Sequence, residues 1–185
     1  FNQAINLNPD YYPAYNNLGN LLMELDRLDD AETILNQAIK LNPNLVQAYN
    51  NLGITLKKLK KFLESESILR KAIAIKPDYS EAYINLSGTL QELKKFDESE
   101  IVIRKAIELK PNSPEAYNNL AHILRANGKL EDAEMYYRQA LALDPNFSKV
   151  YFNLGNTVKD LGKIEEALDY FKKALELNPN FVNAH

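Results

Sequence analysis

The 185-residue chain contains no cysteine, no tryptophan and only two histidines. Without cysteine it can form neither a disulfide nor a zinc site of the Cys/His type. No apolar run approaches the ~20 residues that a membrane-spanning helix needs, and no signal-peptide pattern is present. We therefore expect a cytoplasmic protein with no metal or other cofactor and no membrane partner.

The chain also has no large excess of either charge, because it contains 22 Lys and Arg and 25 Asp and Glu, which gives a net charge of −3. Nucleic-acid-binding surfaces are normally strongly basic, so we expect no nucleic-acid partner. The one local exception is a lysine cluster at Lys57, Lys58, Lys60 and Lys61. We interpret it as a solvated turn between helices rather than as a contact for phosphate or an acidic peptide.

What the chain does have is a proline at a fixed spacing. The six prolines that follow one another at intervals of 34 residues are Pro9, Pro43, Pro77, Pro111, Pro145 and Pro179. A constant period of this length indicates stacked copies of one structural unit rather than a single globular core.

Other positions recur in register with these prolines. Five residues before each proline is an alanine: Ala4, Ala38, Ala72, Ala106, Ala140 and Ala174. Six residues after each of the first five is a tyrosine: Tyr15, Tyr49, Tyr83, Tyr117 and Tyr151. A leucine and then a small residue follow: Leu18-Gly19, Leu52-Gly53, Leu86-Ser87, Leu120-Ala121 and Leu154-Gly155. A second small residue precedes a large apolar one by four: Ala31/Leu35, Ser65/Leu69, Ser99/Ile103, Ala133/Tyr137 and Ala167/Phe171.

The spacing of these residues is helical. Apolar or small side chains that share one face of a first helix are Tyr15, Leu18, Gly19, Leu22 and Leu25, and those of a second helix are Ala31, Leu35, Ala38, Ile39 and Leu41. Each unit is therefore predicted to be a helical hairpin. The small residues allow its two helices to approach closely.

Local signals place the ends of these helices. Gly128 and Gly162 lie in the turns of later hairpins, where a glycine can adopt the left-handed conformation that closes a helix. Ser113 followed by Pro114 is typical of an N-cap with proline in the first turn. The proline that closes each unit ends the second helix, since it disfavours α conformation in the residue before it.

The motif resembles the tetratricopeptide repeat (TPR), whose signature is an aromatic residue, then Leu-Gly, then Ala with an aromatic four residues later, then Pro. Here tyrosine replaces the signature tryptophan. The resemblance implies an all-α, right-handed α-solenoid of stacked helix-turn-helix units. We expect one array over 1–185 with five full units: 12–45, 46–79, 80–113, 114–147 and 148–181. Residues 1–11 would be a partial unit and 182–185 the start of another, so we expect an excerpt of a longer protein.

No constellation of side chains suggests catalysis. His122 is the single histidine within the units, and no glycine-rich phosphate loop is present. Carboxylates recur at one outer position of four units, Glu32, Glu66, Glu100 and Glu134. We interpret that recurrence as a solvated face rather than as acid–base pairs in a cleft. We therefore predict that the chain is not an enzyme.

In TPR proteins the first helix of each unit lines a concave groove, and the resemblance implies the same here. The side chains predicted to line it, at the fifth, sixth and ninth positions of the units, are Asn16, Asn17, Asn20, Asn50, Asn51, Ile84, Asn85, Asn118, Asn119, His122, Phe152, Asn153 and Asn156. The sixth position is asparagine in all five units.

The sequence allows two hypotheses for the role of the sixth-position asparagines. A primary amide offers a donor and an acceptor side by side, which suits the backbone of an extended peptide. Equally, each amide could bond a neighbouring hairpin. Phe152 and Ile84 are apolar within a polar stripe and suggest contact points for a partner, unless they pack onto the next unit.

We accordingly predict a non-catalytic scaffold that binds an extended or helical peptide segment of a partner protein in its groove. One alternative is the substrate-selecting arm of a larger enzyme. Units such as AYNNLGN are similar to the TPR arm of O-linked N-acetylglucosamine transferases. Another alternative is a scaffold that self-assembles head to tail through uncapped terminal units.

Overall fold

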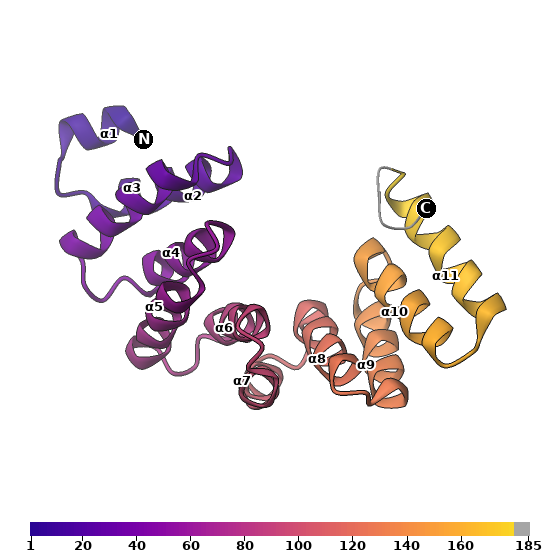
Figure 1. Cartoon of the computed structure of the whole chain (residues 1–185). Helices are drawn as coiled ribbons and strands as arrows, with labels where there is room; N and C mark the ends of the chain where they lie inside the picture. Colours follow the sequence, from indigo (N-terminus) through magenta and orange to yellow (C-terminus); the bar gives the residue numbers. More distant parts are fainter. Residues whose placement is uncertain (180–185) are drawn as a thin grey trace. The chain divides into compact units, whose positions relative to one another are not determined.

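The computed structural model describes residues 1–179, apart from the side chains of residues 2 and 4, and within that range it is helical with no strand (Figure 1). Its helices are α1 (Asn2–Leu7), α2 (Tyr12–Glu24), α3 (Leu28–Leu41), α4 (Val46–Lys58), α5 (Phe62–Ile75), α6 (Ser80–Glu92), α7 (Phe96–Leu109), α8 (Pro114–Ala126), α9 (Leu130–Leu143), α10 (Ser148–Asp160) and α11 (Ile164–Leu177). The predicted start of a further unit at 182–185 lies outside the described residues.

The chain forms two compact halves, Phe1–Lys95 and Phe96–His185, which we call the N-terminal half and the C-terminal half. In the N-terminal half α2 pairs with α3 and α4 with α5, while α3 packs on α4 and α5 on α6. In the C-terminal half α8 pairs with α9 and α10 with α11, while α7 packs on α8 and α9 on α10. The predicted all-α solenoid of helical hairpins is confirmed.

Within a hairpin the closest approach joins a small residue on the first helix to a large one on the second. A methyl group added at Gly19 would lie 2.5 Å from Leu35 Cγ, and one added at Gly53 would lie 2.5 Å from Leu69 Cγ. The alanines that precede the prolines are equally enclosed, since Ala38, Ala72, Ala106, Ala140 and Ala174 are all fully buried. Packing between the helices therefore depends on the absence of side-chain volume at fixed positions, as the sequence indicates.

Each hairpin turn closes its first helix in the same way. The main-chain N–H of Lys129 donates to Leu124 O at 2.9 Å, and that of Lys163 donates to Val158 O at 2.9 Å. The residue before each of these lysines has a left-handed backbone, with φ of 76° at Gly128 and 81° at Gly162. This is the Schellman arrangement, and it confirms the glycine prediction.

Helix ends elsewhere also follow the sequence signals. Ser113 Oγ accepts a hydrogen bond from the main-chain N–H of Ala116 at 3.3 Å, which confirms the predicted N-cap of α8. Residues that precede the prolines have extended backbones, for example Asn42 with φ −136° and ψ 94°. The second helix of each unit therefore stops where proline forces the chain out of the α region.

Candidate functional site

The predicted binding residues lie on the first helices of the units. In the N-terminal half these helices are α2, α4 and α6, and α4 contacts both of the others. In the C-terminal half they are α8 and α10, which contact each other. We call the surface that carries the fifth, sixth and ninth positions of these helices the first-helix face, and describe it separately for each half.

On the first-helix face, amide side chains bond across neighbouring units. Asn51 Nδ2 donates to Asn16 Oδ1 at 3.1 Å, and Asn85 Nδ2 donates to Asn50 Oδ1 at 2.9 Å. The C-terminal half repeats the pattern, because Asn153 Nδ2 donates to Asn118 Oδ1 at 3.0 Å. Each bond joins the sixth position of one unit to the fifth position of the unit before. For these three asparagines the structure supports the reading in which the amide ties adjacent hairpins.

The inter-unit bond uses only one of the hydrogen-bonding groups of each sixth-position amide. A carboxamide has two N–H donors and one carbonyl oxygen, so one donated bond leaves an N–H and the oxygen. The acceptors Asn50 and Asn118 are each only 6% exposed, whereas Asn51, Asn85 and Asn153 are half-buried. The sixth-position amides are thus fixed at one end and still reach the surface.

Two sixth-position asparagines differ from the rest. Asn17 is exposed, and its Oδ1 accepts from Asn16 Nδ2 at 3.5 Å. Asn119 accepts in the same way from Asn118 Nδ2 at 3.4 Å. One unit before Asn119 the fifth position is Ile84, which has no carboxamide to accept a bond. The sequence therefore breaks the fifth-to-sixth amide pattern at the third unit.

Sequence reasoning missed a row of buried hydroxyls beneath these asparagines. The fully buried Thr55 donates through Oγ1 to the main-chain oxygen of Asn51 at 2.9 Å. Thr89 and Thr157 do the same to Asn85 at 3.1 Å and Asn153 at 2.9 Å. Each threonine lies four residues after a sixth-position asparagine that makes an inter-unit bond. A hydroxyl at an otherwise apolar helix position is the signal that could have revealed them.

The remaining predicted residues are less closely connected. Asn20 Nδ2 donates to Glu24 Oε1 at 2.8 Å, and Asn156 Nδ2 donates to the main-chain oxygen of Phe152 at 3.1 Å, so both bond within their own helix. The ring of Phe152 lies 5.8 Å from that of Phe171, centroid to centroid, in the same hairpin. Ile84 is half-buried and His122 is exposed.

One hollow in the C-terminal half borders the first-helix face at His122. It has a volume of about 270 Å³ and is lined by His122, Arg125, Ala126, Leu130 and Asp160. Arg125 Nη2 and Asp160 Oδ2 form an ion pair at 2.6 Å that joins α8 to α10. The positions that line it are the ninth, twelfth, thirteenth and seventeenth of their units, so it shares only the ninth position with the first-helix face.

The interpretation of the recurring glutamates as a solvated face is wrong. Each pairs with a lysine in the hairpin turn of the next unit: Lys61–Glu32 at 2.8 Å, Lys95–Glu66 at 2.9 Å, Lys129–Glu100 at 3.9 Å and Lys163–Glu134 at 2.8 Å. The four glutamate side chains are only 6–22% exposed. A carboxylate at one position and a lysine 29 residues later was the signal that pointed to this ion-pair ladder.

Protonation of the ladder reflects these contacts. Burial opposes the charge of Glu66, but hydrogen bonds from Lys95 and Arg70 outweigh it and lower the pKa of that carboxyl. The hydrogen bond to Glu32 raises the pKa of Lys61. Lys61 therefore belongs to the ladder, and only part of the lysine cluster is a solvated turn.

The residues at 1–179 contain no group of three or more His, Cys, Asp or Glu placed to hold a metal ion. Within the same range, no helix combines the length and the apolar character that crossing a bilayer requires.

Comparison with known proteins gives consistent family matches. Three family models, each described as tetratricopeptide repeat, match residues 10–78, residues 56–123, and residues 114–147 with 148–181. Together they cover 10–181. No curated protein matches the chain by sequence.

Several solved structures share the fold. YrrB, described as a TPR protein with an unusual peptide-binding site, aligns with a TM-score of 0.69 and 24% identity over 100% of this chain and 95% of its own. A thermophilic TPR protein of Thermus thermophilus aligns with a TM-score of 0.84 and 24% identity, covering 94% of each chain. A chain of the APC/C hetero-tetramer Cut9–Hcn1 aligns with a TM-score of 0.93 and 16% identity, over 100% of this chain and 37% of that one. At these identities the likeness shows the fold alone.

Proposed function

We propose that this chain, which belongs to the tetratricopeptide repeat family, is a non-catalytic scaffold that binds an extended segment of a partner protein along its first-helix face. TPR arrays are stacks of hairpins whose repeated surfaces suit the binding of proteins and peptides. We place the partner on the first-helix face because its asparagine amides can bond a peptide backbone.

The observation that carries the proposal is the set of inter-unit amide bonds. They hold Asn51, Asn85 and Asn153 in one arrangement while leaving a carbonyl oxygen and an N–H on each. Groups that are already ordered lose little conformational entropy on binding. Packed helices lie ~8–10 Å apart. That spacing corresponds to about three residues of an extended peptide at ~3.3 Å each. The amides could therefore bond the partner backbone at regular intervals.

The helix position of Asn119 also favours a role in ligand binding. Asparagine in a helix interior is less favourable than alanine by ~0.6 kcal/mol. At Asn51, Asn85 and Asn153 the inter-unit bond offsets that cost. The residue that corresponds in the sequence to Asn16, Asn50 and Asn118 one unit before Asn119 is Ile84, which has no carboxamide to accept a bond. A ligand that bonds the Asn119 amide would supply the compensation.

The proposal is tested by selecting peptides from a random dodecapeptide display library and measuring their affinity for the chain. Asn119→Ala should weaken the selected peptides about tenfold, because a pair of backbone hydrogen bonds is lost. N-methylation of the contacted peptide nitrogens should have a similar effect, whereas changing the neighbouring side chains should matter less.

Asn36→Ala is the matched control, because Asn36 lies on the second helix α3 and bonds within that helix, to Glu32 O at 2.9 Å. It should leave peptide affinity unchanged. Failure to select any peptide, or full affinity in an Asn119→Ala chain that remains folded, would refute the proposal.

The two alternatives from the sequence remain predictions. A glycosyltransferase domain in the same reading frame would support the substrate-selecting arm. Light scattering that rises with protein concentration would support the head-to-tail scaffold.

A further inference from the structure

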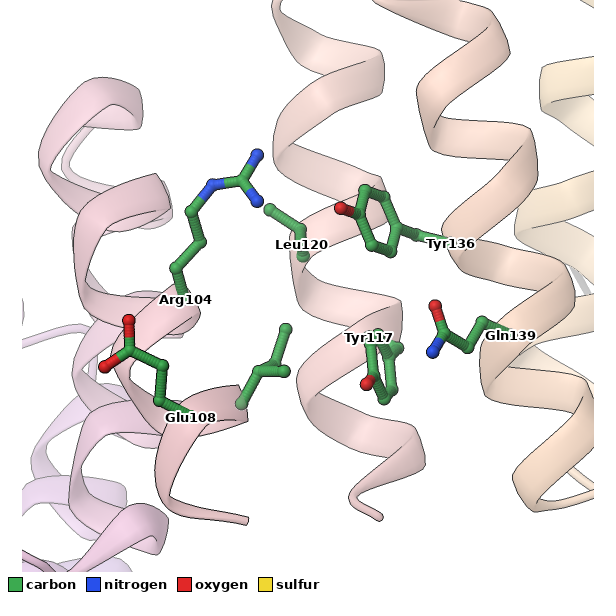
Figure 2. Close-up of a pocket in the computed structure, with 7 residues that line it drawn as sticks. Arg104, Glu108, Tyr117, Leu120, Tyr136 and Gln139 are labelled. Atoms are coloured by element: carbon green, nitrogen blue, oxygen red, sulfur yellow. The ribbon is translucent and has the colours of Figure 1, made fainter. Parts of the chain in front are cut away.

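A second cleft lies on a different set of positions, among the helices α7, α8 and α9 of the C-terminal half (Figure 2). Its volume is about 400 Å³, and it is lined by Arg104, Ile107, Glu108, Tyr117, Leu120, Tyr136 and Gln139. None of these residues belongs to the first-helix face, so the cleft is independent of the proposed peptide site. Its size falls within the range of pockets that hold small ligands or single side chains.

The cleft has an aromatic and aliphatic base with polar groups at its edges. The rings of Tyr117 and Tyr136 stack with centroids 6.2 Å apart and planes 16° apart. Ile107 and Leu120 complete the apolar surface. Figure 2 shows Glu108 on α7 and Gln139 on α9 at the two sides, with Tyr117 between them and Arg104 toward the other end.

The charge of Arg104 is already engaged. Its Nε and Nη2 donate to Glu100 Oε1 at 3.0 Å and 2.7 Å. The hydrogen bond with Glu100 and then the one with Tyr136 raise the pKa of the Arg104 guanidinium. Arg104 therefore lines the cleft with its positive charge already paired with Glu100.

Glu108 is the accessible charge. Its Oε2 pairs with Lys105 Nζ at 2.8 Å, and the side chains are 67% and 50% exposed. Such an exposed pair three residues apart on a helix contributes little, so an incoming cation can displace the lysine.

The other units provide an internal comparison. The residues that correspond to Glu108, each with the counterpart of Gln139 one unit later, are Asn6 with Gln37, Lys40 with Lys71, Ala74 with Lys105, and Ala142 with Lys173. Three of those four pairs contain at least one lysine, and none contains an acid. Glu108 with Gln139 is the combination that has an acid and no base. The sequence thus favours a cation at this cleft and disfavours one at the corresponding positions that carry lysine.

We propose that this cleft binds the side chain of an arginine presented by a partner protein. The Glu108 carboxylate accepts hydrogen bonds from the guanidinium, in the planar geometry that arginine provides, and Gln139 on the opposite side of the cleft adds no competing positive charge. The methylene stem lies on Ile107, and the partly exposed ring of Tyr136 lies under the cation.

The test uses the full chain, labelled with ¹⁵N, and two probes. Nα-acetyl-L-arginine N-methylamide should shift the amide resonances of α7, α8 and α9, and the uncharged citrulline analogue should bind about tenfold more weakly, since it cannot form a charge-assisted bond. The lysine analogue should bind more weakly than arginine because it is not planar. Equal binding of citrulline or lysine, or shifts confined to the first-helix face, would overturn the assignment.

Substitutions at and near Glu108 test whether its carboxylate binds the arginine. Glu108→Gln should weaken arginine binding about tenfold, and Lys105→Gln should strengthen it by removing the competing ammonium group. Glu176→Gln is the matched control, since Glu176 occupies the same position in the fifth unit and pairs with Lys173 at 2.9 Å. It should change nothing. Arginine binding that survives Glu108→Gln in a chain with an unchanged melting temperature would refute the site.

Discussion

In the N-terminal half a leucine meets a glycine at the closest approach of each full hairpin, Leu35 at Gly19 and Leu69 at Gly53. In the two full hairpins of the C-terminal half, α8 with α9 and α10 with α11, the large residue is aromatic, with Phe171 at Gly155 and Tyr137 at the position equivalent to Leu35. Stacked tyrosines accompany this change, since Tyr117 lies against Tyr136. The same hairpin backbone is therefore packed in two ways, with an aliphatic side chain between the helices in one half and an aromatic one in the other.

The halves also differ in polar structure. The N-terminal half has two successive inter-unit amide bonds, from Asn51 and Asn85, and the C-terminal half has one, from Asn153. The buried Ser65 Oγ donates to Gly53 O at 2.8 Å and lies 3.0 Å from Thr89 Oγ1. Each junction of first helices within a half thus carries one amide bond, and the halves differ in the hydroxyl contact, since the counterparts of Ser65 and Thr89 in the C-terminal half are Ala133 and Thr157. The 34-residue frame therefore fixes where helices meet, but not which kind of contact joins them.

The largest expected effect comes from adding volume at the glycine contact of the N-terminal half. Gly53→Ala would put a methyl group 2.5 Å from Leu69 Cγ, the branch point of a fully buried side chain. Overpacking of this kind costs ~1–3 kcal/mol and should exceed the helix-propensity gain of ~1 kcal/mol. Urea denaturation should show a loss of stability.

Gly88→Ala is the control for that substitution. Gly88 lies within α6, and an added methyl group would meet the mobile end of Lys57, at Nζ, 3.1 Å away. The variant should be more stable than the parent by ~0.5–1 kcal/mol, from helix propensity alone. If both glycine variants shift stability in the same direction, the glycine contact is not what limits the spacing of the hairpin.

The second effect concerns the amide bonds. Asn85→Ala removes the donor to Asn50 Oδ1, which is nearly buried, and should cost about 1 kcal/mol after the gain in helix propensity. Asn119→Ala should instead stabilise by ~0.6 kcal/mol, because Ile84 offers no carboxamide acceptor one unit earlier. Thermal melts of the two variants compare them directly. Equal destabilisation would show that the amide pattern is not broken at the third unit.

Much of this architecture could be predicted from the sequence, because periodicity constrains it. The 34-residue period, the small residues such as Gly53 and the prolines each impose a local geometry that no distant contact can reverse. The polar links between units were harder to foresee. Asn85 could have bonded a ligand or a neighbour, and the choice depends on how two helices are spaced, which the residue type alone does not encode. Glu66 was misread for the same reason, since its lysine partner is 29 residues away.

The third effect tests the aromatic filling of the C-terminal half. The Tyr137 hydroxyl is fully buried and has no hydrogen-bond partner, and burial raises the pKa of this phenol. Tyr137→Phe should therefore stabilise the chain by about 1 kcal/mol, since it removes an unsatisfied polar group and keeps the ring. Phe171 already occupies the equivalent position in the next unit.

Tyr170→Phe provides the contrast, because the Tyr170 hydroxyl donates to Glu166 Oε1 at 3.0 Å. That substitution should cost ~0.5–1 kcal/mol in the same urea titration. A loss of stability in Tyr137→Phe would mean that its hydroxyl is bonded after all, and that the aromatic half carries no polar cost.

A further expected effect lies in the hairpin turns. In the N-terminal half the left-handed turn residues are Asp26, Lys60 and Lys94, with φ of 58°, 61° and 60°, whereas the C-terminal half has Gly128 and Gly162. A side chain costs ~1 kcal/mol in this conformation, partly offset by the greater freedom of glycine in the unfolded chain. Lys60→Gly should thus stabilise by ~0.5 kcal/mol, and Gly128→Ala should destabilise by about 1 kcal/mol. Hydrogen exchange of the amides that follow each turn would assign each change to its half. If Lys60→Gly instead speeds exchange in α4 and α5, its side chain stabilises the turn, and the halves do not differ in backbone strain.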